Sequence, residues 1–233
     1  MLPAMPDLDA ILQARQERID ALHTCVPGRT ALLVIDMQCG FIREGASLEV
    51  AAARDIIPNI RCLIDAFRQR EAPVIFTEFV YSSAVPCLRG DPFGVEHLPV
   101  PEGAETGFGF PSANCLIGPG AGDGPESAST IEELAPLPDE LVVQSHTYDK
   151  FFDTPLDLAL RSRGIGSLVL TGVTTDVCVN STLIAASTRN YRVTAVRDGC
   201  ASPWPDLHDA CFSIWDKKFA RVRNTAEIVA EIK

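Results

Sequence analysis

The sequence lacks the segments and motifs that would place it in a membrane or give it a structural metal. None of its apolar runs approaches the roughly 18 residues of a membrane-spanning helix. Its 8 cysteines include no CxxC pair and its 4 histidines are scattered, so we predict no metal site and no cofactor. The first residues have neither a basic start nor an apolar stretch, and we expect no signal peptide and a cytoplasmic protein.

Positive charge is also scarce. The chain of 233 residues has 20 Lys and Arg against 31 Asp and Glu, which gives a formal net charge of −11. Such a chain repels phosphate backbones and anionic lipid, so neither nucleic acid nor a membrane is a predicted partner. Hydrophobic residues make up 46% of the sequence, enough to exclude bulk disorder and to fill a core without disulfides.

Apolar runs alternate with amphipathic stretches along most of the chain. The run at 30–36 is apolar throughout and ends in a carboxylate, which is typical of a strand buried on both faces. Further strands are predicted at 73–78, 141–144, 167–171, 191–196 and 219–222, and helices at 50–70, 156–163, 177–189, 206–217 and 225–232. This alternation predicts an α/β fold with a mostly parallel six-stranded sheet between helices. Ligands of such sheets bind at the C-terminal strand ends, where the strand order reverses.

We expect a single domain over 1–233 with two additions. Residues 7–23 have helical apolar spacing, so 1–28 are predicted to form an N-terminal helical extension. Residues 82–138 are rich in Gly, Pro and Ser, and we interpret them as a loop-rich, structureless excursion that walls a pocket or a subunit contact. A plain flexible insertion is the alternative.

Two residues lie where a sheet of this kind usually carries its catalytic groups. Asp36 ends the first strand, although a turn-forming Asp is common there. Cys178 falls in the first turn of a predicted helix, where free N–H groups and the helix dipole would lower the thiol pKa and hold an oxyanion. A buried cysteine packing the helix start is the competing interpretation. The interpretation of Cys178 as a redox-active cysteine is weakened, because no resolving cysteine lies nearby in sequence.

Three segments together resemble the isochorismatase-like cysteine hydrolase superfamily, from about residue 30 to 223 apart from much of 82–138. They are VIDMQ at 34–38, FFDTPLD at 151–157 and GVTTDVCV at 172–179. The resemblance implies a three-layer α/β/α sandwich of Rossmann-like type and catalysis by an Asp, a Lys and a Cys. It makes Asp36 the general base and Cys178 the nucleophile that forms a thioester. It also implies a cis peptide bond between Val173 and Thr174 that shapes an oxyanion hole.

The lysine is where the sequence departs from this superfamily. The usual lysine position, six residues before Phe151, holds Ser145, and Lys150 stands five residues later. Three interpretations are open. Lys150 reaches back and supplies the charge, or Ser145 and His146 form a different electrostatic arrangement, or the chain is a non-catalytic ligand-binding member of the fold.

Other departures narrow the expected substrate. Residues 77–81 contain no histidine, so the resemblance does not extend to the metal motif of nicotinamidases. The nucleophilic Cys favours hydrolysis of a carbon–nitrogen bond over cleavage of a vinyl ether. The segment 151–157 is most similar to the ureide-cleaving branch, which implies an amidohydrolase for a small ureide or primary amide that releases ammonia. Candidate pocket residues at the strand ends are Phe41, Glu78, Tyr81 and Phe152. Members of the superfamily are commonly dimers or tetramers, so a homo-oligomer is expected.

Overall fold

A parallel six-stranded sheet forms the centre of the molecule. The computed structural model describes residues 7–46, 48–82, 84–85, 114–119 and 121–232. The strands are β1 (Thr30–Ile35), β2 (Val74–Phe79), β3 (Leu141–Ser145), β4 (Ser167–Val173), β5 (Arg192–Ala201) and β6 (Arg221–Arg223). Their order is β3-β2-β1-β4-β5-β6, and each neighbouring pair is parallel. The predicted α/β class and the parallel sheet are confirmed.

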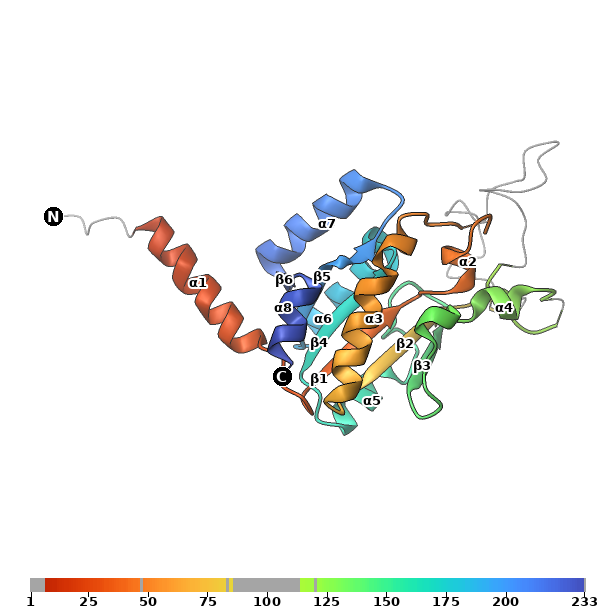
Figure 1. Cartoon of the computed structure of the whole chain (residues 1–233), viewed down its shortest axis with the longest axis horizontal. Coiled ribbons are helices and arrows are strands. Elements are labelled where there is room, and N and C mark those ends of the chain that lie inside the picture. The colour runs from red at the N-terminus through yellow and green to blue at the C-terminus, as the bar shows by residue number, and fades with distance from the viewer. Residues whose placement is uncertain (1–6, 47, 83, 86–113, 120, 233) are drawn as a thin grey trace.

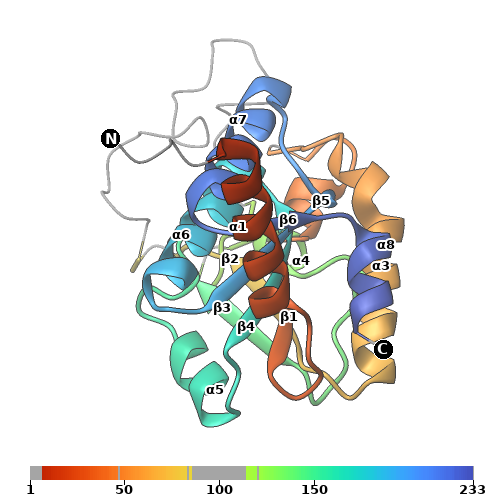
Figure 2. The same ribbon diagram turned by 90° about the vertical axis from the view of Figure 1, so that its left-hand side faces the viewer.

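Helices cover both faces of the sheet and complete three layers (Figure 2). The helices are α1 (Leu8–His23), α2 (Cys39–Ile42), α3 (Ala53–Gln69), α4 (Gly124–Ala128), α5 (Leu156–Ser162), α6 (Asn180–Thr188), α7 (Pro205–Lys218) and α8 (Thr225–Glu231). One core cluster joins α3 and α8 to the sheet, and a second joins α5, α6 and α7 to the opposite face. None of the described helices combines the length and apolar character needed to cross a membrane.

Strand β1 shows why the central strands are apolar without alternation. Leu33 and Ile35 belong to the cluster under α5–α7, whereas Leu32 and Val34 belong to the cluster under α3 and α8. Each of its residues is buried, because a parallel strand in the middle of a sandwich has helices on both sides.

The strand order reverses at β1. From β1 the chain adds β2 and β3 on one side, and it then returns to place β4, β5 and β6 on the other. Ile35 is in register with Thr77 of β2 and with Gly172 of β4. The residues that follow β1 and β4 therefore emerge side by side at the C-terminal edge, where α/β sheets bind ligands.

Three local predictions are wrong. The strand predicted at 167–171 continues to Val173 and so includes Gly172. The helix predicted at 177–189 starts only at Asn180, because a π-helical turn over Thr175–Val179 precedes it and contains Cys178. The described end of the 82–138 excursion is not structureless, since it forms α4 and a 3-10 turn at Glu132–Leu134. The glycine and proline content of this part predicted a loop, and composition alone did not distinguish a loop from short helices.

Gly172 is required by the close contact between β1 and β4. Its φ is +117°, and a Cβ atom there would overlap the backbone of Ile35. We expect Gly172→Ala to lower the free energy of unfolding by at least about 3 kcal/mol, because a strained φ and a backbone clash add together. Urea denaturation measures the change. Gly166→Ala is the control, since nothing lies within 4 Å of a Cβ at that position. Equal stability of the two variants would contradict the argument.

Candidate active site

Asp36, Lys150 and Cys178 converge at the C-terminal edge of the sheet. Asp36 follows β1, Lys150 lies in the loop after β3, and Cys178 lies in the π-helical turn after β4. The Lys150 Nζ atom is 2.8 Å from Asp36 Oδ2, and both side chains are fully buried. The Cys178 thiol is buried as well, and it lies close enough to the Asp36 carboxylate for that charge to raise the thiol pKa. The carboxylate thus lies between an ammonium group and a thiol.

The Asp36 carboxylate is held by the neighbouring strand. Thr77 Oγ1 donates a hydrogen bond of 2.7 Å to Asp36 Oδ1, and the Asp36 backbone N–H donates to the Thr77 carbonyl. Asp36 has a positive φ of 52°, a conformation that Asp tolerates better than most residues. Sequence reasoning missed Thr77, although a buried polar residue in an otherwise apolar strand is a signal for such a role.

Lys150 reaches Asp36 from a compact turn. Its backbone N–H donates to Thr182 Oγ1, and its Nζ donates to the Thr147 carbonyl at 3.1 Å. The ammonium also lies 5.4 Å from the centroid of the Phe79 ring. These contacts correspond to the first of the three interpretations, in which Lys150 reaches back toward the carboxylate.

Ser145 has a different set of contacts. Its hydroxyl donates to the Thr147 carbonyl at 3.0 Å and accepts from the Thr147 N–H at 3.2 Å. Among the described hydrogen bonds it has none to Asp36 or Cys178. Ser145 therefore stabilises the turn that brings Lys150 to Asp36. Position 145 itself carries no charged group.

The Cys178 thiol is protonated in the resting site. Burial raises its pKa well above the ordinary range, and the Asp36 charge raises it further. The Lys150 charge and a hydrogen bond from the Thr174 backbone act in the opposite direction but are weaker. The sequence-based expectation of a lowered thiol pKa is wrong, because desolvation outweighs the free N–H groups of the turn. A thiol in this state must lose its proton to a base before it can act as a nucleophile, and Asp36 is the charged group that acts most strongly on its pKa.

This ionisation gives a testable pH dependence. We expect no thiolate absorbance from Cys178 at neutral pH, measured as the ultraviolet difference between the wild type and Cys178→Ser. Asp36→Asn removes the negative charge that raises the thiol pKa while Lys150 remains. The thiolate signal should then appear at a lower pH than in the wild type. A shift to higher pH, or no shift, would show that Asp36 does not act on this thiol.

The turn between β4 and α6 positions backbone groups around the sulfur. The peptide bond between Val173 and Thr174 is cis, at the place that the resemblance implies. The Thr174 carbonyl accepts from the N–H groups of Val177 and Val179. Thr175 Oγ1 lies 2.9 Å from His208 Nδ1, which ties the turn to α7.

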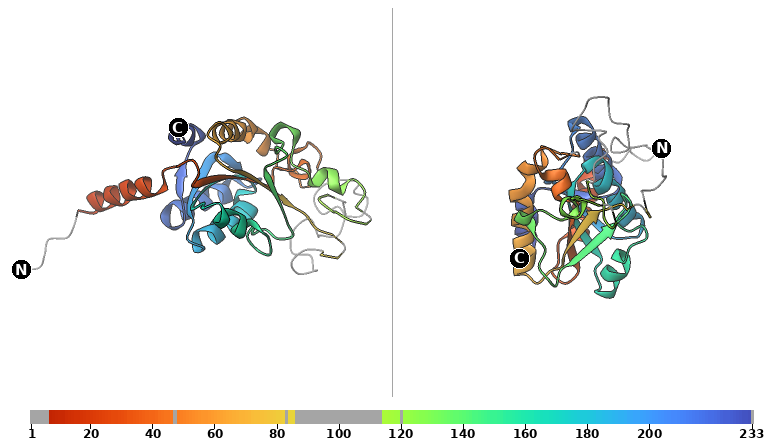
Figure 3. Two further views of the ribbon diagram at one scale, coloured as in Figure 1. Left: turned by 90° about the horizontal axis from the view of Figure 1, so that it is seen from below. Right: turned by 90° about the vertical axis from the view of Figure 1, so that its right-hand side faces the viewer.

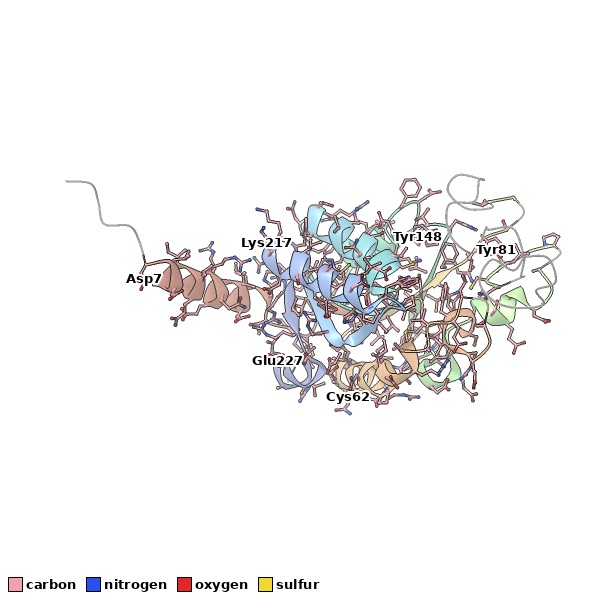
Figure 4. All side chains as sticks on the ribbon, turned by 90° about the horizontal axis from the view of Figure 1, so that it is seen from above. Asp7, Cys62, Tyr81, Tyr148, Lys217 and Glu227 are labelled. Atoms are coloured by element: carbon pink, nitrogen blue, oxygen red, sulfur yellow. The ribbon has the colours of Figure 1, made fainter. Side chains whose placement is uncertain are left out.

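The predicted pocket residues divide into two groups. Phe41 and Tyr81 pack on a small apolar cluster that contains Phe79, the ring beside the Lys150 ammonium. Tyr81 and Phe79 have ring centroids 6.4 Å apart. Phe152, by contrast, is 57% exposed, and no described contact brings it to Asp36, Lys150 or Cys178. Figure 4 shows Tyr81 and Tyr148 at the end of the molecule that lies opposite α1.

Glu78 is buried, and its carboxylate accepts hydrogen bonds from other residues of the chain. One oxygen accepts from the Thr130 N–H at 3.0 Å and from its hydroxyl at 3.2 Å, and the other accepts from Gln144 Nε2. Glu78 therefore anchors the segment that follows α4. Its role as a substrate contact stays a prediction.

Gln38 is a further residue that sequence reasoning missed. Its side-chain amide donates to the carbonyls of Phe79 and Ala128 and accepts from the Phe79 N–H, at 2.7–2.8 Å. It thereby joins the ends of β1 and β2 to α4. Across the described ranges, no three His, Cys, Asp or Glu side chains are grouped so that they could hold a metal ion.

The sequence is similar to a known family and to curated relatives. A model of the isochorismatase domain matches residues 30–227. The ureidoacrylate amidohydrolase RutB of Enterobacter sp. is 33% identical over 178 residues, which cover 74% of this chain and 73% of the relative. Its counterpart in Cronobacter sakazakii is 32% identical over 178 residues, 74% of this chain and 72% of the relative.

Two solved structures are also similar. A cysteine hydrolase from Pseudomonas syringae pv. phaseolicola aligns with a TM-score of 0.69 at 26% identity, covering 90% of this chain and 94% of that one. The N-carbamoylsarcosine amidase from Thermoplasma acidophilum aligns with a TM-score of 0.63 at 26% identity, covering 84% and 96%.

Proposed function

The chain belongs to the isochorismatase family, near its ureide amidohydrolases, and we infer that this hydrolase of carbon–nitrogen bonds works through a thioester on Cys178. The observation that carries the proposal is the buried contact of Cys178 with Asp36, which in turn pairs with Lys150 at 2.8 Å. A thiol, a base and a fixed positive charge are the groups that nucleophilic attack on a carbonyl requires.

The geometry supports a definite first step. Asp36 removes the proton from the Cys178 sulfur as the sulfur attacks the carbonyl carbon of the substrate. The Lys150 charge, which lowers the thiol pKa, stabilises the thiolate that develops. Backbone N–H groups of the turn that begins at Thr174 face the negative charge that forms on the carbonyl oxygen.

The leaving nitrogen then takes the proton from Asp36, and the carbon–nitrogen bond breaks. For a ureide R–NH–CO–NH2 the products of this step are ammonia and the thioester R–NH–CO–S on Cys178. A water molecule that loses a proton to Asp36 attacks the thioester and releases the thiol. The resulting N-substituted carbamic acid decomposes to the amine and carbon dioxide. A primary amide would follow the same steps and leave a carboxylic acid.

The substrate proposed is a small ureide or primary amide. The support comes from relatives named ureidoacrylate amidohydrolase and N-carbamoylsarcosine amidase. Phe79, Tyr81 and Phe41 provide an apolar wall beside the catalytic groups. A wall of this kind suits a small, uncharged carbamoyl or amide group.

Ammonia release from a substrate panel tests the proposal. The panel contains N-carbamoylsarcosine, ureidoacrylate analogues, biuret, nicotinamide and simple aliphatic amides. We expect release from at least one ureide or aliphatic amide, and an acid-quenched reaction should show added mass on the peptide that carries Cys178. Absence of release from every compound would favour the non-catalytic, ligand-binding alternative. Release without added mass on Cys178 in rapid-quench samples would contradict the thioester.

A further inference from the structure

A hollow of about 460 Å³ opens at the edge of the sheet where β1, β4 and β5 begin. Its wall combines the end of α1 with residues just before β1 and with the residues at which β4 and β5 start. Figure 1 and the left part of Figure 3 show α1 at the end of the molecule that lies opposite α4. Asp36, Lys150 and Cys178 follow the other ends of the strands, so the length of the sheet separates this hollow from the candidate active site.

Two arginines line the hollow on either side of Ser167. Ser167 starts β4 and is in register with Thr30 of β1 and with Arg192 of β5. The carbonyl of Arg29, the residue before Thr30, accepts from the Ser167 N–H at 3.1 Å. Because neighbouring strands lie about 4.8 Å apart, the backbone holds Arg29 and Arg192 about 10 Å apart with Ser167 between them. Both guanidinium groups are thus placed to bind one ligand group.

The charge of this arginine pair is not neutralised within the part of the chain that the structure describes. The Arg29 side chain forms none of the described hydrogen bonds or ion pairs, and Arg192 donates only from Nη1, to the Leu22 carbonyl at 2.9 Å. A guanidinium has five N–H donors, so most of the donors of the pair are unused. Asp20, the acidic residue in the last turn of α1, pairs with Arg223 instead. The hollow is therefore a positively charged site on a chain whose net charge is −11.

Neutral polar groups add donors to the same wall. The Ser167 hydroxyl and the Asn190 side-chain amide line the hollow, and neither forms a described hydrogen bond. No Asp or Glu is among the described residues of the lining. Guanidinium, hydroxyl and amide groups without an opposing carboxylate are a set that favours a ligand with several anionic oxygens.

The end of α1 gives the hollow an apolar side. Leu22 and Val26 both line it and are 38% and 50% exposed. Together with Arg29 they precede residue 30, where the match to the family model begins. The Arg192 contact with the Leu22 carbonyl holds this side against the sheet. The N-terminal extension therefore completes a cavity that the matched domain would leave open.

We propose that this hollow binds a small organic phosphate, with the phosphate between Arg29 and Arg192 and the organic part against Leu22 and Val26. A phosphate monoester carries up to two negative charges and three terminal oxygens on one atom, which suits two guanidinium groups and the Ser167 hydroxyl. A volume of about 460 Å³ lies in the range of small-molecule pockets and leaves room for the organic part.

Calorimetric titration of the full chain tests the proposal with inorganic phosphate and phenyl phosphate at constant ionic strength. We expect one saturable site for each, and phenyl phosphate should bind at least about threefold more tightly because its ring covers Leu22 and Val26. Leu22→Ser should remove this preference and leave the affinity for inorganic phosphate unchanged. Equal affinity of the wild type for the two ligands would overturn the assignment to an organic phosphate.

Charge-neutralising variants test the two arginines. Arg29→Gln and Arg192→Gln should each weaken the binding of both ligands at least about tenfold, since each removes charge-assisted hydrogen bonds. Arg18→Gln is the control, because it makes the same change of charge in α1 outside the lining, and it should alter the affinity less than about twofold.

Arg29→Gln is the decisive variant, because its side chain forms no described contact within the protein and its loss leaves the fold intact. Circular dichroism checks the fold of all four variants. Absence of saturable phosphate binding to the wild type would overturn the proposal. Binding that Arg29→Gln leaves unchanged, or that Arg18→Gln weakens equally, would overturn it as well.

Discussion

Cys178→Ala is expected to abolish hydrolysis, with kcat lowered by at least about four orders of magnitude on whichever substrate the panel identifies. The substitution removes the atom that forms the covalent intermediate, and the neighbouring groups are not placed to attack the carbonyl themselves. Asp36 would still face Lys150 at the bottom of the site, so binding of substrate should persist. Steady-state ammonia release and a binding isotherm measure the two effects separately.

The fold should survive this change. Alanine removes one sulfur atom from a buried position and leaves the Asp36–Lys150 pair in place, so we expect the free energy of unfolding to fall by no more than about 2 kcal/mol. Cys200→Ala provides the matched control, because Cys200 is equally buried but lies in β5 and contacts the Leu170 carbonyl. That variant should retain activity. Comparable activity of the Cys178 and Cys200 variants would rule out Cys178 as the nucleophile.

Lys150→Met is expected to have the second-largest effect, lowering kcat by about two to four orders of magnitude. Without the ammonium the thiolate loses a stabilising charge, and the pKa of Cys178 rises further. The buried Asp36 carboxylate also loses its ion-pair partner, which costs about 3–5 kcal/mol of folding stability. Ammonia release and urea denaturation measure the two losses in the same preparation.

A second substitution separates the role of the charge from that of the position. Ser145→Lys in the Lys150→Met background returns a lysine to the position that the superfamily usually uses. If the charge is what matters, this double variant should recover at least about tenfold in kcat over Lys150→Met. Lys150→Met with full activity would show that the displaced lysine takes no part, and the ion pair would then be structural alone.

The strand pattern predicted the fold because a buried parallel strand has a recognisable composition. The same pattern singled out Asp36, which follows β1 directly, and Cys178, which lies in the turn after β4. The approach of Lys150 to Asp36 was only one of three alternatives. It depends on a turn held by the hydrogen bond that Ser145 donates to Thr147 and the one that Thr182 accepts from Lys150. No local sequence rule gives the direction in which such a turn points.

Burial was the property that sequence reasoning handled least well. The thiol pKa was expected to fall, yet it rises, because the sequence shows the free N–H groups of a helix start but not the apolar walls around the sulfur. The sequence likewise did not separate Glu78 from Phe152. The first is buried on internal partners and the second is exposed, although both were predicted as pocket residues.

The close contact between Ile35 and Gly172 has an evolutionary consequence. The backbone of two neighbouring strands fixes where the chain leaves β1 toward Asp36 and β4 toward Cys178, so no long connection sets the separation of these two residues. Insertions and deletions in the segments that follow β2 and β3 can accumulate without moving Asp36 away from Cys178. Substrate preference can therefore diversify through changes in loop length while the reaction is inherited intact. Lys150, which reaches the Asp36 carboxylate from the loop after β3, is placed where such a change in loop length would act.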